Sequence, residues 1–326
     1  MVSSGAAPIS QTVEEQEKFD FAEKSSSGAT VSGTIARRGV FTGGRGDEGW
    51  RHENCDRPPF LEMTFKFGSW NVNSRDLKGG HVDLLRRVDC DVLALQEATK
   101  DFHAELAALP LFEWSVSSLT LRPAKPKEKR ARHLGCSIFG RSPFRSLSAE
   151  LLNQLDFPER ALVVRTSSAV GRLTICSFHT PPGANWGEIK PRTLKAIAEW
   201  LALQGGSIVF GIDANAPKTD HPNPLENEWW WDEEPLLLGA APVHQLRDAL
   251  RIFFEKRPEA LAEIRRERPH GPLAISHIRG RGSNKTPCRY DFIYVSPDVI
   301  VRDVTYLYEE AVEAGSDHAL VVACLS

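Results

Sequence analysis

The chain contains 326 residues, of which 41% are hydrophobic and 25% charged, and its formal net charge is -3 at pH 7. This length is sufficient to bury a large core, and the charge excludes a uniformly basic nucleic-acid coat protein while leaving room for a local basic patch. No apolar run approaches the roughly 20 residues that cross a bilayer, and the first residues lack the basic and apolar segments of a secretory signal. We therefore expect no membrane association.

Six cysteines are distributed along the chain without any pair in the CxxC spacing of a zinc or redox site. This pattern is typical of reduced thiols, some of them buried as small apolar side chains. It favours a cytoplasmic location. The cysteines are Cys55, Cys90, Cys136, Cys176, Cys288 and Cys324.

Residues 1–60 differ in composition from the rest of the chain. Ser, Gly, Thr and charged residues dominate there, so too little apolar surface is available to offset the entropy of ordering. We predict a disordered or loosely attached leader, followed by one domain over residues 61–326. An adaptor or targeting role for the leader remains an open alternative.

From residue 64 onward, strand-like and helix-like patterns alternate. Apolar residues recur at helical spacing in two segments, 81–88 and 186–203, and the remaining apolar runs are short enough for strands. Many strands with few interposed helices predict an α/β fold, a four-layer α/β sandwich in which two packed mixed sheets are flanked by helices. The strand candidates are 64–70, 91–96, 113–118, 136–140, 161–166, 173–178, 207–212, 290–295, 304–308 and 319–325.

The segment 217–286 interrupts this alternation and is interpreted as an elaborated surface insertion of the same domain. It contains three consecutive tryptophans, Trp229, Trp230 and Trp231, and helical patterns near 246–254 and 258–268. Tryptophans can stack on nucleic-acid bases, but adjacent tryptophans more often wedge a loop against the core. The acidic residues that flank them favour the structural interpretation.

Polar residues that suit phosphate chemistry stand at the ends of the predicted strands. Any one of them alone would be read as a turn or a hydrogen-bonded structural residue. Together, carboxylates, carboxamides and histidines that converge at strand ends suit a hard cation and an activated water. The set is Asn71, Glu97, His179, Asp213, Asn215, Asp291, Asp317 and His318.

Six segments around these residues resemble, in order, the endonuclease/exonuclease/phosphatase superfamily, with the opening closest to exonuclease III-type enzymes. One of them departs from the family pattern, because it reads G-I-D-A-N where the family has G-D-x-N. A single such segment is a weak signal, whereas six in family order are a strong one. They are GSWNVNSR (68–75), CDVLALQE (90–97), GCSIFGRSP (135–143), GIDANAP (211–217), RYDFIYVS (289–296) and SDHA (316–319).

The resemblance implies a Mg²⁺-dependent phosphoesterase, with Mn²⁺ as an alternative ion, and it implies roles for the matching residues. Glu97 would be the principal metal ligand, with Asn71 and Asp317 beside it. Asp213 and Asn215 would orient the attacking water and a phosphate oxygen. His318 would contact the scissile phosphate, with Asp291 steering its ring. Either Asp213 or His318 would serve as general base.

His179 departs from the exonuclease III-type pattern, in which a tyrosine tends to stand at this strand end. Deoxyribonuclease I-like, sphingomyelinase-like and inositol phosphatase members tend to carry a histidine. The resemblance thus implies that His179 protonates the leaving oxygen. A structural histidine bonded to a loop carbonyl is the alternative.

Two basic stretches, 122–133 and 279–289, stand out in this slightly acidic chain. Lysines and arginines at such sites contact the phosphate backbone without reading sequence. A solvated loop tip explains the first stretch equally well, whereas the second leads directly to the strand of Asp291. We predict Arg192 and Arg289 as substrate-binding residues.

Three function classes follow from these observations. The first is a nuclease that hydrolyses phosphodiesters of nucleic acid, supported by the opening motif and the basic stretches. The second is a phosphatase or phosphodiesterase acting on a small molecule or lipid headgroup, supported by His179 and the near-neutral charge. The third, a catalytically silent binding module, is disfavoured by the complete set of polar residues. No protein partner is inferred from the sequence.

Overall fold

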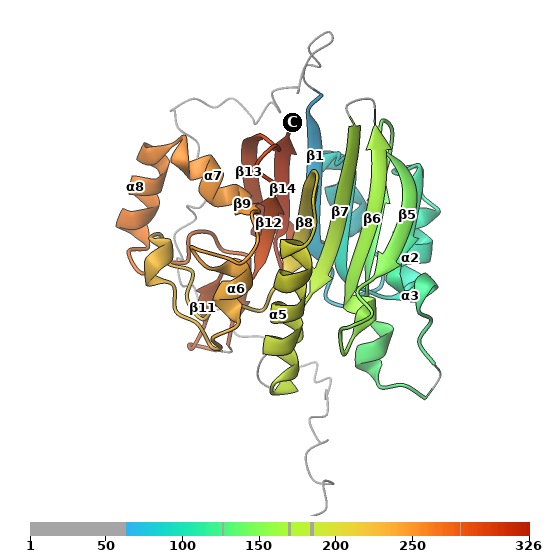
Figure 1. Cartoon of the computed structure of the whole chain (residues 1–326), viewed down its shortest axis with the longest axis horizontal. Coiled ribbons are helices and arrows are strands. Elements are labelled where there is room, and N and C mark those ends of the chain that lie inside the picture. The colour runs from blue at the N-terminus through green and yellow to red at the C-terminus, as the bar shows by residue number, and fades with distance from the viewer. Residues whose placement is uncertain (1–62, 126, 169–170, 183–185, 281) are drawn as a thin grey trace, which may run out of the picture. The chain divides into compact units, whose positions relative to one another are not determined.

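The structure is a computed structural model that describes residues 63–326 except 126, 169–170, 183–185 and 281. Strands with apolar residues on both faces form its centre. The expected leader over 1–60 and Cys55 lie outside the described residues. Two six-stranded mixed sheets stand at the centre of the described chain, and helices flank them (Figure 1). The predicted α/β sandwich of two packed mixed sheets is confirmed.

The first sheet is built around β1, which pairs in parallel with β2 and antiparallel with β14. Its strand order is β13-β14-β1-β2-β4-β3. The strands are β1 (Phe65–Asn71), β2 (Val92–Ala98), β3 (Trp114–Ser117), β4 (Gly135–Gly140), β13 (Val301–Leu307) and β14 (Leu320–Leu325).

The second sheet is built around β7 and β8, which are parallel neighbours, and its order is β5-β6-β7-β8-β12-β9. The pairing sets His179 opposite Asp213, and Asp213 opposite Asp291, at the ends of three adjacent strands. The strands are β5 (Arg145–Leu151), β6 (Ala161–Ser168), β7 (Gly171–His179), β8 (Ile208–Asp213), β9 (Arg247–Asp248) and β12 (Asp291–Val295).

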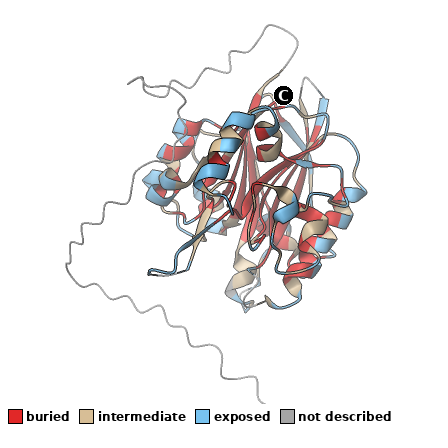
Figure 2. Cartoon of the chain, turned by 90° about the vertical axis from the view of Figure 1, so that its left-hand side faces the viewer, coloured by how far each residue is buried: buried red, intermediate tan, exposed pale blue. Residues whose placement is uncertain are grey.

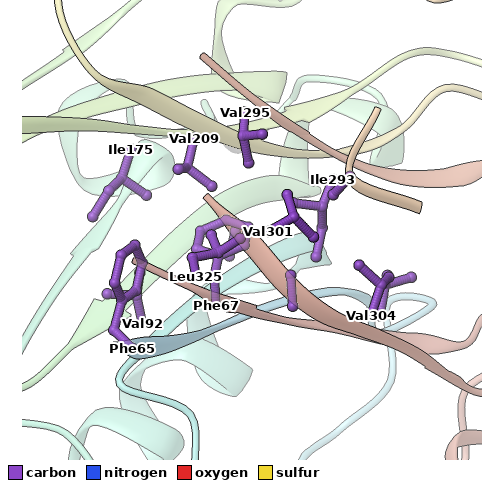
Figure 3. Close-up of a cluster of buried hydrophobic side chains, with 14 of the residues drawn as sticks. Phe65, Phe67, Val92, Ile175, Val209, Ile293, Val295, Val301, Val304 and Leu325 are labelled. Carbon is purple, nitrogen blue, oxygen red and sulfur yellow. The ribbon is translucent and has the colours of Figure 1, made fainter. Parts of the chain in front are cut away.

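Alternate residues of the central strands serve two different cores. In β8, Val209 faces the core between the sheets, whereas Phe210 and Ile212 face the helices outside. The core between the sheets draws apolar side chains from both of them (Figure 3). Because each sheet is covered on both faces, its central strands carry apolar runs rather than a one-sided alternation.

Helices cover the outer face of each sheet, and their solvent sides are exposed (Figure 2). Helices α1, α2 and α9 pack on the first sheet, α5 and α6 pack on the second, and α7 and α8 border the core between the sheets. Helix α3 packs beside β4. None of the helices in the described part of the chain has the length and apolar character needed to cross a bilayer. The helices are α1 (Gly79–Val88), α2 (Lys100–Ala107), α3 (Ser118–Leu121), α5 (Ile189–Ala202), α6 (Glu234–Leu238), α7 (Ala249–Glu255), α8 (Pro258–Glu267) and α9 (Tyr308–Ala314).

The segment 217–286 contains α6, α7 and α8 and short strands. Its last part forms a two-stranded hairpin of β10 (His277–Arg279) and β11 (Thr286–Cys288). An isolated bridge joins His277 to His318, so the hairpin borders the start of β14. The insertion therefore reaches the same strand ends as the predicted polar residues.

Candidate active site

A bulge in β2 places Glu97 at the mouth of the site. The register with β4 shifts between Leu95 and Ala98, and Glu97 has a φ of 53° in the left-handed region. Non-glycine residues adopt this conformation at a cost that the surrounding fold must sustain, and such residues gather at functional sites. Because of the bulge, Gln96 remains buried and Glu97 points toward β7. The distance from Glu97 Oε1 to His179 Nε2 is 3.4 Å.

Asp213 is the centre of a hydrogen-bond network that crosses between the sheets. Its Oδ2 accepts from Asn71 Nδ2 at 2.7 Å and from Asn215 Nδ2 at 3.2 Å, and its Oδ1 accepts from the Asn215 backbone N–H at 3.0 Å. Asn71 ends β1 in the first sheet, whereas Asp213 ends β8 in the second. Asn215 has a φ of 48°, which turns its amide back toward Asp213 and the Thr180 carbonyl. The carboxylate is therefore held in one orientation.

His318 pairs with Asp291 on the other side of Asp213. Its Nδ1 lies 2.9 Å from Asp291 Oδ2, and its Nε2 lies 4.0 Å from Asp213 Oδ2. The backbone of the loop is tied to β1, because Trp70 Nε1 donates to the His318 carbonyl at 3.1 Å and Ser316 Oγ donates to the Asn71 carbonyl at 2.6 Å. The ring of His318 is thus oriented by Asp291, with its second nitrogen directed toward Asp213.

The pKa values of Asp213 and His318 are both raised in the folded protein. Burial raises the pKa of Asp213 to about 7, an effect that the His318 charge opposes and the Asp291 charge reinforces. Burial alone would lower the pKa of His318, but the charges of Asp291 and Asp213 raise it to about 10. At neutral pH, His318 is therefore an imidazolium, and Asp213 lies close to its own titration midpoint.

His179 is kept neutral by its surroundings. Burial, together with the nearby Arg160 charge, holds its pKa well below the usual range. Arg160 Nη1 lies 3.2 Å from His179 Nδ1 and 3.4 Å from Nε2, so the guanidinium stands beside both ring nitrogens. His179 Nε2 also lies 3.4 Å from Glu97 Oε1 and 3.7 Å from Asp213 Oδ2.

The carboxylates of the site offer oxygen ligands that suit a hard divalent cation, whereas His318, as an imidazolium, has no lone pair for one. Two groups of three side chains in the described part of the chain bring potential ligand atoms within 4.8 Å of one another, namely Asp213 with Asp291 and His318, and His277 with Asp317 and His318. Asp291 Oδ1 is buried without a hydrogen-bond partner, so an acceptor is left over inside the cluster. Neither group includes Glu97, which joins the cluster through His179 instead.

The two predicted substrate arginines lie outside this cluster. Arg289 is buried, and its guanidinium donates to both carboxylate oxygens of Asp248 at 2.8 and 2.6 Å, with Asp220 3.3 Å away. Arg192 stands on the exposed side of α5 and pairs with Asp156 at 3.0 Å. Arg289 also donates to Tyr306 Oη at 2.8 Å, so its guanidinium joins the insertion to β13.

Two residues beside the site were missed by sequence reasoning. Arg160 is the last residue of a short 3₁₀ turn, Pro158–Arg160, and no spacing rule marks it. His277 stacks on His318, with ring centroids 4.5 Å apart, and its Nδ1 lies 3.0 Å from the Asp317 carbonyl. Its position just before the basic stretch that ends at β12 was the one available signal.

Comparisons with known proteins agree with this fold. Residues 68–318 match the model of the Endonuclease/Exonuclease/phosphatase family. The chain therefore belongs to this family, whose members are metal-dependent phosphoesterases. No curated protein sequence matches the chain.

Several solved structures share the fold at low sequence identity. D. rerio TDP2, in complex with a single-strand DNA product, is 15% identical with a TM-score of 0.59, over 81% of this chain and 100% of that chain. The human Nocturnin catalytic domain with a bound sulfate anion is 15% identical with a TM-score of 0.53, over 82% of this chain and 95% of that chain. ANGEL2, a 2',3'-cyclic phosphatase, is 16% identical with a TM-score of 0.52, over 81% and 95%. At such identities, the likeness shows the fold alone.

Proposed function

We propose that the protein is a Mg²⁺-dependent hydrolase of phosphodiester bonds in nucleic acid, with Mn²⁺ as an alternative ion. The observation that carries this proposal is the continuous network from Asn71 through Asp213 to His318 and Asp291. It joins an ionisable carboxylate, a cationic imidazole and oxygen donors for a cation. A pure scaffold has no need for so many buried charges, because each one is costly to remove from water.

Asn71, Glu97 and Asp317 would hold the cation, as the family resemblance implies. When bound, the ion would neutralise phosphate charge and lower the pKa of a water molecule. Within the chain, Asp213 is suited to accept the proton of the attacking water, since its pKa of about 7 matches neutral conditions. His318, held as an imidazolium by Asp291, is suited to stabilise the charge that develops on the phosphate oxygens.

For His179 we propose a role that follows from its low pKa. A neutral imidazole can donate a hydrogen bond but carries no spare acidic proton at neutral pH. We assign His179 to binding a phosphate oxygen rather than to protonating the leaving group. Arg160, behind it, supplies positive charge close to Glu97 and Asp213.

A small phosphoester is the alternative substrate, and one observation favours it. In the basic loop, Arg122 pairs with Glu128 at 2.8 Å and Arg132 pairs with the buried Glu159 at 3.1 Å. These two cations are therefore partly neutralised and form a weaker phosphate-binding surface than the sequence predicts.

The test is a substrate panel offered to the full chain with Mg²⁺, Mn²⁺ or EDTA. It contains single-stranded DNA, plasmid DNA, RNA, bis-p-nitrophenyl phosphate and inositol phosphates. We expect metal-dependent cleavage of nucleic acid that EDTA abolishes. Turnover of the small esters alone would replace this proposal with the phosphatase alternative, and turnover of no substrate would remove the enzymatic proposal altogether.

Two conservative variants locate the chemistry. Asp213→Asn keeps the shape but cannot accept a proton, so we expect kcat to fall about 10²- to 10⁴-fold. Glu97→Gln should shift the Mg²⁺ titration of activity to higher concentration. Thermal unfolding by circular dichroism serves as the control for folding, and full activity of Asp213→Asn would show that another group takes the proton.

A further inference from the structure

Trp230 is an exposed aromatic side chain with two cations beside it. Its relative exposure is 47%, and its ring centroid lies 5.3 Å from Arg279 Cζ and 5.7 Å from Lys218 Nζ. Its neighbour Trp229 instead packs against the core behind the second sheet. The structural role that the sequence predicts for the tryptophan cluster thus fits Trp229, whereas Trp230 is about half exposed and has Arg279 and Lys218 over its ring.

Both cations stand on chain segments that continue directly from the active site. Lys218 comes three residues after Asn215 in the loop that leaves β8. Arg279 comes two residues after His277 in β10, and His277 stacks on His318. Because alternate strand residues share a face, Arg279 lies on the His277 side of the hairpin, about 7 Å further along it. Trp230 is therefore reached from the site along two separate segments.

The backbone of Trp230 is also anchored to the active-site loop. Its N–H donates to Glu234 Oε2 at 3.0 Å, and Glu234 Oε1 lies 2.7 Å from Lys190 Nζ. Lys190 Nζ in turn donates to the Asn215 carbonyl at 2.7 Å. Lys190 and Glu234 are both fully buried, so this connection is rigid rather than a surface contact. The ring therefore has a defined position relative to Asn215.

We propose that Trp230, Arg279 and Lys218 form a subsite for one unpaired nucleotide beside the bond that is cleaved. The base would stack on the Trp230 ring and the Arg279 guanidinium plane, and the adjoining phosphate would be bound by Lys218 and Arg279. This inference rests on the proposed function and narrows its substrate class to single-stranded nucleic acid. A base inside a duplex keeps its faces stacked on its neighbours and is not available to the ring.

The ion pairing of Lys218 does not oppose phosphate binding. Lys218 Nζ lies 2.9 Å from Glu228 Oε2, but both side chains are about half exposed. Exposed pairs of this kind contribute little free energy, so exchange of Glu228 for a phosphate costs little. Stacking on an aromatic face is sequence-tolerant, and the subsite would accept any base.

The central experiment is Trp230→Ala, with Leu225→Ala as the matched control. Leu225 is 81% exposed on the same insertion and belongs to none of the machinery described above. We expect Trp230→Ala to raise KM for a single-stranded oligonucleotide about 5- to 100-fold, with kcat nearly unchanged. The KM for an abasic oligonucleotide of the same length, which has no base to stack, should be the same in wild type and both variants. Trp230→Phe should restore much of the lost affinity.

The cations are tested by salt dependence. Removal of one phosphate contact to a single strand should reduce the slope of log affinity against log salt by about 0.7. We expect this reduction for Lys218→Gln and for Arg279→Gln, but not for Arg266→Gln, an exposed arginine on α8. Binding of a fluorescein-labelled oligonucleotide in EDTA, followed by anisotropy, measures the affinity without turnover.

The outcomes separate the subsite from the function on which it rests. Unchanged oligonucleotide affinity in Trp230→Ala, or an equal loss of affinity for the abasic oligonucleotide, would overturn the subsite even if the wild type is a nuclease. Oligonucleotide binding that depends on Trp230, without cleavage by the wild type, would support the subsite and contradict the proposed function. Should Trp230→Ala fail to fold, the salt slopes of Lys218→Gln and Arg279→Gln decide the matter.

Discussion

His318 is the residue whose protonation is most closely linked to the stability of the fold. The folded protein keeps its proton up to about pH 10, whereas the unfolded chain releases it near pH 6.5. Between pH 7 and pH 9 the native state therefore binds about one proton more than the unfolded state. The free energy of unfolding should fall as pH rises, by up to about 1.4 kcal/mol per pH unit.

We expect this decline to be flatter in His318→Gln. Urea denaturation at pH 7, 8 and 9 in EDTA measures it on the metal-free protein. Other groups change the free energy of unfolding mainly outside the range from pH 7 to pH 9. The pKa of Asp213 is raised from 3.8 to about 7, so Asp213 changes the stability below pH 7. Burial raises the pKa of the Cys90 and Cys136 thiols from 9.0 to about 12, so these thiols change the stability above pH 9. Parallel pH dependence in wild type and variant would show that His318 is not the proton carrier.

At this same scale, the sequence predicts the chemical identity of the site but not the state of its side chains. Asp213, Asp291 and His318 stand in motifs, and the structure brings them together. The low pKa of His179 comes first from its burial and then from Arg160, which is 19 residues away and matches no motif that we recognised. A pKa depends on burial and on charges that are distant in the chain, and neither is readable from local pattern.

Among the elements, the junction of α5 with the insertion depends on one buried ion pair. Lys190 and Glu234 are both fully buried, and they join the Asn215 carbonyl to the Trp230 backbone. Loss of one partner would leave the other charge buried and uncompensated. We expect Lys190→Met to lower the free energy of unfolding by about 3–5 kcal/mol, measured by urea denaturation.

The matched comparison is the double variant Lys190→Met with Glu234→Met, which removes both charges. Replacement of a whole buried pair by apolar side chains of similar volume is often close to neutral. We therefore expect the double variant to regain most of the lost stability. A double variant that is less stable than Lys190→Met would show that the carboxylate does more for the fold than balance the lysine.

The sequence predicts strands correctly where burial requires a run of apolar residues, and it misses strands at the exposed edges of the sheets. Strands β1, β2 and β8 are buried throughout most of their length, and their apolar runs mark them clearly. Strand β5 was missed because it is an edge strand with mostly exposed residues, so no face of it has to be apolar. The β10–β11 hairpin was missed for a similar reason, since its strands are short and only partly buried.

At the level of the whole molecule, each sheet contributes one half of the candidate site. Asn71, Glu97 and His318 come from the first sheet, and His179, Asp213 and Asp291 come from the second. The motifs predict that these residues meet at strand ends, but neither the sheet to which each belongs nor the distance between the sheets. That distance depends on buried contacts such as Gln96 Nε2, which donates to Ser69 Oγ in one sheet and Ser177 Oγ in the other.

Ser69 and Gly211 mark the place where the sheets approach most directly beneath the site. A Cβ atom on Gly211 would lie 2.2 Å from Ser69 Oγ and 2.5 Å from Ser69 Cβ, so one sheet would have to move. Asn71 and Asp213 each stand two residues beyond this contact, and their 2.7 Å hydrogen bond would be stretched by any separation. We expect Gly211→Ala to cost about 1–3 kcal/mol of stability and to lower kcat even at temperatures where the variant is fully folded.

Ser69→Gly supplies the compensating change, because it removes both atoms with which the new Cβ would clash. The double variant Ser69→Gly with Gly211→Ala should therefore be more stable and more active than Gly211→Ala alone, although Gln96 would keep only its bond to Ser177. Thermal unfolding and kcat of the wild type, both single variants and the double variant complete a double-mutant cycle. Additive effects on both quantities would mean that the spacing of the sheets is set elsewhere, whereas a coupled recovery would tie the geometry of the catalytic network to this one contact.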